Sequence, residues 1–159
     1  MLEIPLTKDV ILWAWEKSKA VGIINAHRPS PVSTFVGAIG EKIVLDNLGI
    51  CAEEQSRINY DIKYKGKRVE VKTKTTSVKP KPHYEAVVSE SAIKQSCDYY
   101  AFLRLKNDLS VAWLCGYVSK FDFLEKAQFI EKGRNLGHRV QTWNQYIMEI
   151  QELDDGIKS

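Results

Sequence analysis

An alternating stretch of apolar and charged residues at positions 58–72 constrains the fold of this chain more than any other segment. Apolar residues occupy every second position up to Tyr64, and the alternation resumes at Val69, which is the period of half-buried strands. Lys65 and Gly66 separate the two halves, and a glycine with a positive φ favours a tight turn between strands. The segment therefore predicts a β-hairpin in which Tyr64 faces residue 67.

This register places two carboxylates opposite each other, because counting outward from the turn pairs Asp61 with Glu70. Directly opposed residues hold their Cβ atoms about 4.5 to 5.5 Å apart. At ~5 Å and an effective dielectric constant of ~20, two negative charges repel by about 3 kcal/mol. A divalent cation between them would turn that repulsion into a binding site, since Mg²⁺ prefers hard oxygen ligands. Lys72, two residues after Glu70, is expected on the same face, where an ammonium can orient a water molecule or neutralise charge on a phosphate.

A third acid is expected on a helix that precedes the hairpin. Residues 33–48 are apolar with helical spacing, and Gly49 suits the helix end. Residues three and four positions from Glu41 share its face of such a helix, and they are small or apolar: Gly37, Ala38, Val44 and Leu45. A carboxylate in those surroundings needs a cationic partner to stay charged.

These residues resemble the motif of the PD-(D/E)xK nuclease superfamily: an acid on a helix, an Asp at a strand, and Glu-x-Lys on the next strand. The resemblance covers roughly residues 37–133 and is carried by Glu41, Asp61, Glu70 and Lys72. Tyr60 stands where the family name has proline, a position that varies in the superfamily. The resemblance implies an α/β (α+β) protein with the restriction-endonuclease-like αβββαβ core, a central mixed sheet flanked by helices.

The same resemblance implies a metal-dependent endodeoxyribonuclease that hydrolyses DNA phosphodiester bonds with Mg²⁺, for which Mn²⁺ can substitute. Its catalytic residues would be Glu41, Asp61, Glu70 and Lys72. Asp61, Glu70 and the carbonyl of Val71 would bind the metal, Glu41 would support it directly or through water, and Lys72 would serve the attacking water. Two alternatives stay open: a nucleic-acid-binding or protein-interaction module without catalysis on the same fold, and an RNA-directed nuclease. The residues do not choose among phage replication, DNA repair, recombination and host defence.

The Glu-x-Lys motif has little weight alone, because a chain of this length contains one by chance about 0.5 times. Its weight comes from the opposed Asp61, the hairpin pattern and the upstream Glu41. A competing assignment uses Asp61-Ile62-Lys63 as the acid-x-Lys motif, with Glu53 or Glu54 as the upstream acid. A solvent-exposed charged hairpin face is the simplest alternative to both.

Basic residues concentrate around the predicted carboxylate pair. The segment 63–81 contains eight lysines and arginines and a single acid, Glu70, although the net charge of the whole chain is only +3. Lysine and arginine contacts to phosphate supply much of the affinity for nucleic acid, so the predicted partner is DNA. The residues expected to contact it are Lys63, Lys74, Lys79, Lys81 and, in a basic loop at 133–139, Arg134. A lysine-rich sheet edge that discourages aggregation is the alternative explanation.

The remaining segments predict scaffold around one domain spanning 1–159. We expect an N-terminal helical extension at about 7–27 and a frayed acidic tail at about 152–159. Between them, helices are expected at 90–96 and 121–126, and strands at 98–105, 110–119 and 146–150.

The sequence also indicates where such a chain would work. No stretch approaches the ~18 consecutive apolar residues of a membrane span, and the amino terminus lacks the pattern of a signal peptide. Three widely spaced cysteines indicate neither a disulfide framework nor a zinc site. We therefore expect a cytoplasmic protein without membrane contact, in which a homodimer could cut both DNA strands.

Overall fold

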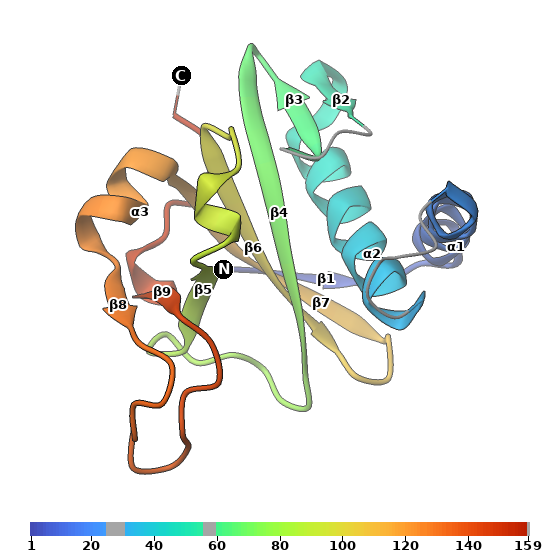
Figure 1. The fold of residues 1–159 in the computed structure, drawn as a ribbon. Helices are drawn as coiled ribbons and strands as arrows, with labels where there is room; N and C mark the ends of the chain where they lie inside the picture. Colours follow the sequence, from blue (N-terminus) through green and yellow to red (C-terminus); the bar gives the residue numbers. More distant parts are fainter. Residues whose placement is uncertain (25–30, 56–59, 159) are drawn as a thin grey trace.

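The computed structural model describes residues 1–24, 31–55 and 60–158, which form a curled mixed sheet with helices and a smaller sheet around it (Figure 1). The strands are β1 (Leu2–Pro5), β2 (Ala52–Glu54), β3 (Ile62–Tyr64), β4 (Lys67–Thr76), β5 (Glu85–Ser89), β6 (Tyr99–Lys106), β7 (Val111–Ser119), β8 (Gln128–Ile130) and β9 (Gln145–Glu149). The α-helices are α1 (Lys8–Ile24), α2 (Pro31–Leu48) and α3 (Lys120–Lys126), and the 3₁₀ helices are η1 (Gly49–Cys51), η2 (Ala92–Lys94) and η3 (Ile150–Glu152).

The main sheet has six strands in the order β1-β7-β6-β4-β3-β2. Only β4 and β6 run parallel; every other neighbouring pair in this sheet is antiparallel. The chain between β4 and β6 includes β5 and η2, and β5 joins β9 and β8 in a second, antiparallel sheet. The prediction of a mixed sheet flanked by helices is confirmed at this level.

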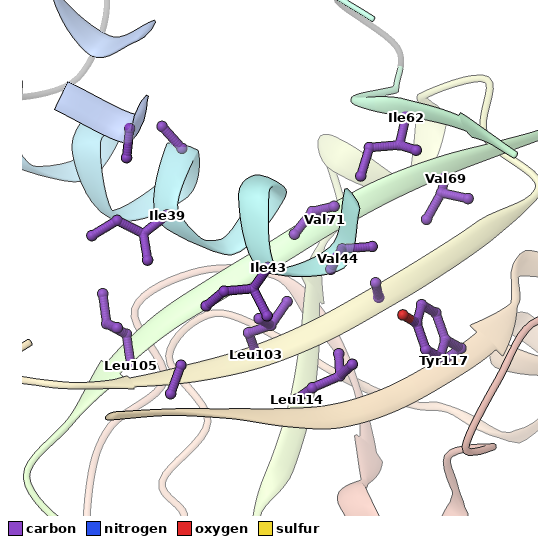
Figure 2. Packing of buried hydrophobic residues seen from close by; sticks show 14 of the residues in the cluster. Ile39, Ile43, Val44, Ile62, Val69, Val71, Leu103, Leu105, Leu114 and Tyr117 are labelled. Carbon is purple, nitrogen blue, oxygen red and sulfur yellow. The ribbon is translucent and has the colours of Figure 1, made fainter. Parts of the chain in front are cut away.

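Helix α2 packs its apolar side on one face of the main sheet. Ile39, Ile43 and Val44 of α2 point toward β4 and the neighbouring strands (Figure 2). The helix begins two residues before the predicted start and ends where predicted, at Leu48, followed by Gly49 with φ +77°. This packing fixes which residues of α2 lie beside β4.

Aromatic residues fill the opposite face of the sheet, beneath α3 and the second sheet. Tyr100 and Phe102 of β6 point to this side, and the Tyr100 ring meets Phe123 of α3 in an edge contact with ring centres 5.4 Å apart. Alternate residues of β4 and β6 therefore face two different cores, one under α2 and one under α3.

The hairpin of β3 and β4 has the predicted register, with Tyr64 opposite Lys67. Lys65 and Gly66 both have positive φ, 47° and 78°, which is the signature of a type I′ turn. Positions 58 and 59, predicted to begin this hairpin, lie outside the described residues. The ladder is short: its last pair is Ile62 with Val69, so Asp61 and Glu70, predicted as direct cross-strand neighbours, are not paired in it.

Several local predictions differ from the structure. The helix expected at 90–96 is only the single turn η2, so the connection between the parallel strands has no α-helix of its own. The N-terminal extension contains α1 as expected, but residues 25–27 of the predicted span lie outside the described part, and β1 before it was not predicted. The tail is not frayed at its start, because Asp154 and Tyr117 exchange two backbone hydrogen bonds of 2.8 Å.

No helix in the described part of the chain is both long and apolar enough to cross a membrane.

Candidate functional site

The β3–β4 ladder ends before Asp61, and the Asp61 side chain binds the backbone edge of β4 in place of a β3 residue. The Asp61 N–H donates to the carbonyl of Val69 at 3.0 Å. Its carboxylate Oδ2 accepts a hydrogen bond of 2.8 Å from the backbone N–H of Val71. A carboxylate thus satisfies a β4 donor just beyond the end of the β3 ladder.

Asp61 lies in strongly negative surroundings. Burial raises its pKa well above the usual range, and repulsion from Glu41 and Glu70 raises it further, while the Val71 N–H and Lys72 oppose the shift. Among the described residues, Asp61 forms no ion pair. Within residues 1–24, 31–55 and 60–158, its carboxylate is therefore the acid at this place without a direct cationic partner.

Glu70 lies on the same strand and is held by a lysine. Its side chain is almost fully buried, and its Oε1 accepts a 2.7 Å hydrogen bond from the Lys72 ammonium. Lys72 also donates to Oε1 of Gln95 at 3.2 Å, and Lys120 donates to the Gln95 carbonyl at 2.6 Å. Gln95 follows η2 in the connection between the parallel strands, so this connection positions Lys72.

Glu41 has a cationic partner, as its predicted surroundings required. The ammonium of Lys17, on α1, forms ion pairs with Glu41 and with Glu54, the latter at 2.7 Å. Burial raises the pKa of Glu41, and Lys17 offsets this only in part. Burial alone would lower the pKa of Lys17, but the two carboxylates outweigh it and raise that pKa.

The structure therefore brings Glu41, Asp61 and Glu70 close enough to repel one another, from α2, the start of the hairpin and β4. Lys72 joins them, whereas Val71 contacts Asp61 through its N–H. Within the described residues, no three His, Cys, Asp or Glu side chains converge into a group that could hold a metal ion.

The donor set nevertheless fits a hard divalent cation in chemical terms. Mg²⁺ takes carboxylate and carbonyl oxygens, which is what Asp61, Glu70 and Val71 offer. A cation beside Asp61 would relieve the repulsion that raises its pKa. Glu41 and Glu70 already pair with Lys17 and Lys72, so a bound metal ion would have to share these two carboxylates with the lysines.

The predicted nucleic-acid contacts are spread along β4 and beyond it. Lys63 lies opposite Arg68 in the hairpin. Lys74 lies near the far end of β4, Lys79 pairs with Glu3 of β1 at 3.4 Å, and Lys81 lies in the connection to β5. Arg134 lies in the loop between β8 and β9.

Sequence reasoning did not identify Lys17 or Gln95. Their contacts join positions 24 and 23 residues apart in the chain, so no local pattern reports them. The competing assignment had singled out Glu53 and Glu54 as upstream acids. Glu53 lies opposite Lys63 in the sheet, and Glu54 shares Lys17 with Glu41, which gives Glu54 a place beside the site.

The comparisons with known proteins leave the family of the chain open. No model of a known protein family matches it, and no curated protein matches it.

Proposed function

We propose that this protein is a metal-dependent endodeoxyribonuclease of the PD-(D/E)xK type. One observation carries the proposal: Asp61 accepts from the Val71 N–H at the edge of β4, lacks an ion-pair partner among the described residues, and has a pKa raised by burial and by repulsion from Glu41 and Glu70. Burial and two neighbouring negative charges make the ionised form of Asp61 unfavourable unless a bound cation compensates. Perturbed acids of this kind are typical of functional sites.

The order of elements supports the proposal. After α2, strands β2, β3 and β4 form an antiparallel series, and β6 then runs parallel to β4. This succession resembles the αβββαβ core, with η2 in the position of its second helix. Because one fold hosts many functions, the side chains carry the argument and the order of strands only supports it.

Each residue has a role in the proposed reaction. Asp61, Glu70 and the carbonyl of Val71 would hold Mg²⁺, with Glu41 supporting from α2. Bound there, the ion supplies a water of lowered pKa and stabilises negative charge on the phosphate. Lys72, already fixed by Glu70 and Gln95, would orient that water or neutralise the phosphate oxygen nearest to it. Lys74 of β4, and Lys79 and Lys81 after it, would contact the DNA backbone.

A specific observation favours one alternative, a nucleic-acid-binding module without catalysis. Lys17 and Lys72 already neutralise Glu41 and Glu70, and such ion pairs can serve the fold alone. In that case the acids would matter for stability and DNA binding would not depend on metal.

A cleavage assay separates the two. Supercoiled plasmid, linear duplex, single-stranded DNA, a branched junction and single-stranded RNA would be incubated with Mg²⁺, Mn²⁺ or EDTA. The wild type is compared with Glu70→Gln and, as a matched control, with Glu125→Gln, whose side chain is exposed on α3.

We expect metal-dependent DNA cleavage by the wild type and by Glu125→Gln, and loss of cleavage in Glu70→Gln with DNA binding retained. Unchanged cleavage in Glu70→Gln would show that the site is misplaced. Binding without cleavage in every condition would establish the non-catalytic module, and cleavage of RNA alone would make the protein an RNA-directed nuclease.

A further inference from the structure

A second charged group lies farther along β4, and neither the proposed metal site nor its lysine uses it. It consists of Lys74 of β4, Arg104 of β6, Arg139 of the loop between β8 and β9, and Glu85 of β5. Alternation along a strand puts Lys74 on the same face as Glu70 and Lys72. We refer to these four residues as the basic cluster.

The basic cluster is held together by contacts from four parts of the chain. Lys74 and Arg104 are direct partners in the parallel register of β4 and β6. The Arg104 guanidinium donates a hydrogen bond to the backbone carbonyl of Glu85. The Arg139 guanidinium forms an ion pair of 3.0 Å with the Glu85 carboxylate. Three cations therefore surround one acid.

Backbone hydrogen bonds hold the loop that carries Arg139. The Leu136 N–H donates to the Arg139 carbonyl at 2.9 Å, and the Gln141 N–H donates to the Arg134 carbonyl at 2.9 Å. Gln141 is buried, and its own carbonyl accepts from the Gly133 N–H at 2.7 Å. The loop projects from the second sheet (Figure 1), and these bonds give Arg139 a defined place beside Glu85.

The cluster has more positive charge than its single acid can balance. Like charges directly opposite on neighbouring strands are destabilising, and Lys74 lies opposite Arg104. Burial lowers the pKa of Lys74, and repulsion from Arg104 and Arg139 lowers it further despite Glu85. In the part of the chain that the structure describes, Lys74 forms no ion pair, because the Glu85 carboxylate is engaged by Arg139. An anion bound among these cations would compensate the repulsion.

We propose that Lys74, Arg104 and Arg139 form a phosphate-binding subsite. It holds the phosphodiester that neighbours the scissile one on the same DNA strand. This inference rests on the proposed nuclease function. Two residues of a β-strand advance by about 7 Å, which is close to the through-space spacing of successive phosphates on one DNA strand, so Lys74 lies one phosphate beyond Lys72 if the DNA runs along β4. Arginine guanidinium groups match phosphate oxygens with paired N–H donors, and Lys74 adds a point charge.

The test measures DNA binding in EDTA, where cleavage plays no part. The affinity of the full-length protein for a duplex and for a single-stranded oligonucleotide is measured by fluorescence anisotropy over a range of salt concentrations. The variants are Lys74→Gln, Arg139→Gln and Glu85→Gln. Lys19→Gln, an exposed lysine of α1 that pairs with Glu16, is the matched control.

Each phosphate contact contributes about 0.9 to the slope of log K against log salt for duplex DNA and about 0.7 for a single strand. We expect Lys74→Gln and Arg139→Gln to make the slope shallower by amounts of this order and to weaken binding. Glu85→Gln removes the only acid of the cluster, so we expect tighter binding, which a purely structural role would not produce. Lys19→Gln should leave both quantities unchanged.

Unchanged slopes in Lys74→Gln and Arg139→Gln, or weaker binding in Glu85→Gln, would overturn the subsite. Arg104 is partly buried, so Arg104→Lys, which keeps the charge, is tested beside Arg104→Gln. DNA affinity that is lost in Arg104→Gln and recovered in Arg104→Lys supports a phosphate contact. Equal loss of affinity in the two variants, both folded, overturns the role of Arg104. Inorganic phosphate is titrated separately, by calorimetry. Saturable phosphate binding that Lys74→Gln abolishes, with unchanged DNA slopes, would assign the cluster to free phosphate and overturn the DNA assignment.

The outcome is separable from that of the nuclease proposal. If the salt slopes change as expected but the protein never cleaves DNA, the subsite is supported and the nuclease proposal is overturned. Metal-dependent cleavage with unchanged slopes would remove the subsite alone.

Discussion

Gly40 of α2 lies so close to Thr73 of β4 that a Cβ atom on the glycine would be 1.8 Å from the Thr73 hydroxyl oxygen. The missing side chain allows the helix to approach the strand directly beside Glu41. We expect Gly40→Ala to push α2 away from β4, to lower the free energy of unfolding by about 1 to 3 kcal/mol, and to weaken cleavage by displacing Glu41. Urea unfolding and the cleavage assay measure the two effects.

Gly37 of the same helix is the control for this prediction. Apart from its chain neighbours and its own helix backbone, no atom of the described residues lies within 4 Å of the place where its Cβ would be, so Gly37→Ala should add helix propensity without a clash. We expect it to raise the free energy of unfolding by about 0.5 to 1 kcal/mol. Equal effects of the two substitutions would show that the approach at Gly40 is not tight.

Asp61→Asn should stabilise the protein at pH 7. Burial, Glu41 and Glu70 raise the pKa of Asp61, so the folded state binds its proton more tightly than the unfolded state does. Stability from this group is therefore complete below pH ~4 and is lost as the pH rises through the folded pKa. The neutral amide removes that loss and can still accept from the Val71 N–H.

We expect the thermal midpoint of Asp61→Asn to exceed that of the wild type by a few degrees at pH 7 and to match it near pH 3. Asp46→Asn, at an exposed position of α2 paired with Lys42, serves as the control and should not gain stability. Mg²⁺ should raise the midpoint of the wild type and not that of Asp61→Asn. A less stable Asp61→Asn at pH 7 would contradict the assigned repulsion.

Lys17→Met should destabilise the protein, because it leaves the Glu41 carboxylate without its cation. The Lys17 and Glu41 side chains are only 15% and 17% exposed, so removal of the ammonium leaves a largely buried carboxylate without its cation. We expect a loss of about 3 kcal/mol in the free energy of unfolding, and a shift of the pH–rate profile toward higher pH because the pKa of Glu41 rises further.

Lys19→Met on the same helix provides the comparison, since Lys19 pairs with an exposed Glu16 and should change stability by less than about 0.5 kcal/mol. Combining Lys17→Met with Glu41→Gln should restore much of the lost stability, because the buried charge is then gone. Losses that simply add in the double variant would argue against a direct coupling of the two residues.

Asp98→Asn should destabilise the protein at pH 7, whereas Asp61→Asn should stabilise it. The Arg68 guanidinium donates to both carboxylate oxygens of Asp98, at 2.9 and 2.8 Å, and holds the pKa of Asp98 below its usual range. This stability is present above pH ~4 and is lost as the pH falls through the folded pKa. We expect a midpoint a few degrees lower at pH 7, measured by thermal unfolding, and little difference near pH 2; a pH-independent loss would mean that charge is not the cause.

The hairpin and α2 could be predicted because their signals are local. The spacing around Lys65-Gly66 sets the partner of Tyr64, and the structure has that pair. The apolar period of residues 33–48 and the glycine after it likewise define α2 almost to the residue. The proximity of Glu41, Asp61 and Glu70 follows from these elements once α2 packs on β4.

The second sheet could not be predicted, because its strands are short and far apart in the sequence. β5 pairs with β9 across a stretch that includes β6, β7 and α3, and no repeating pattern links the two. The turn η2 replaced an expected helix for a similar reason: Gln95 bonds to Lys72 and the Gln95 carbonyl accepts from Lys120, so tertiary contacts override the local preference.

Because Lys17 pairs with Glu41, the pKa of an acid on α2 depends on α1, the helix before it. A shortened protein beginning at α2 would keep Glu41, Asp61, Glu70 and Lys72 but lose the ammonium that opposes the rise of the Glu41 pKa. A substitution of Lys17 on α1 should therefore shift the pH dependence of the proposed cleavage, although Glu41, Asp61, Glu70 and Lys72 stay the same. The smallest active unit of this chain should accordingly include α1.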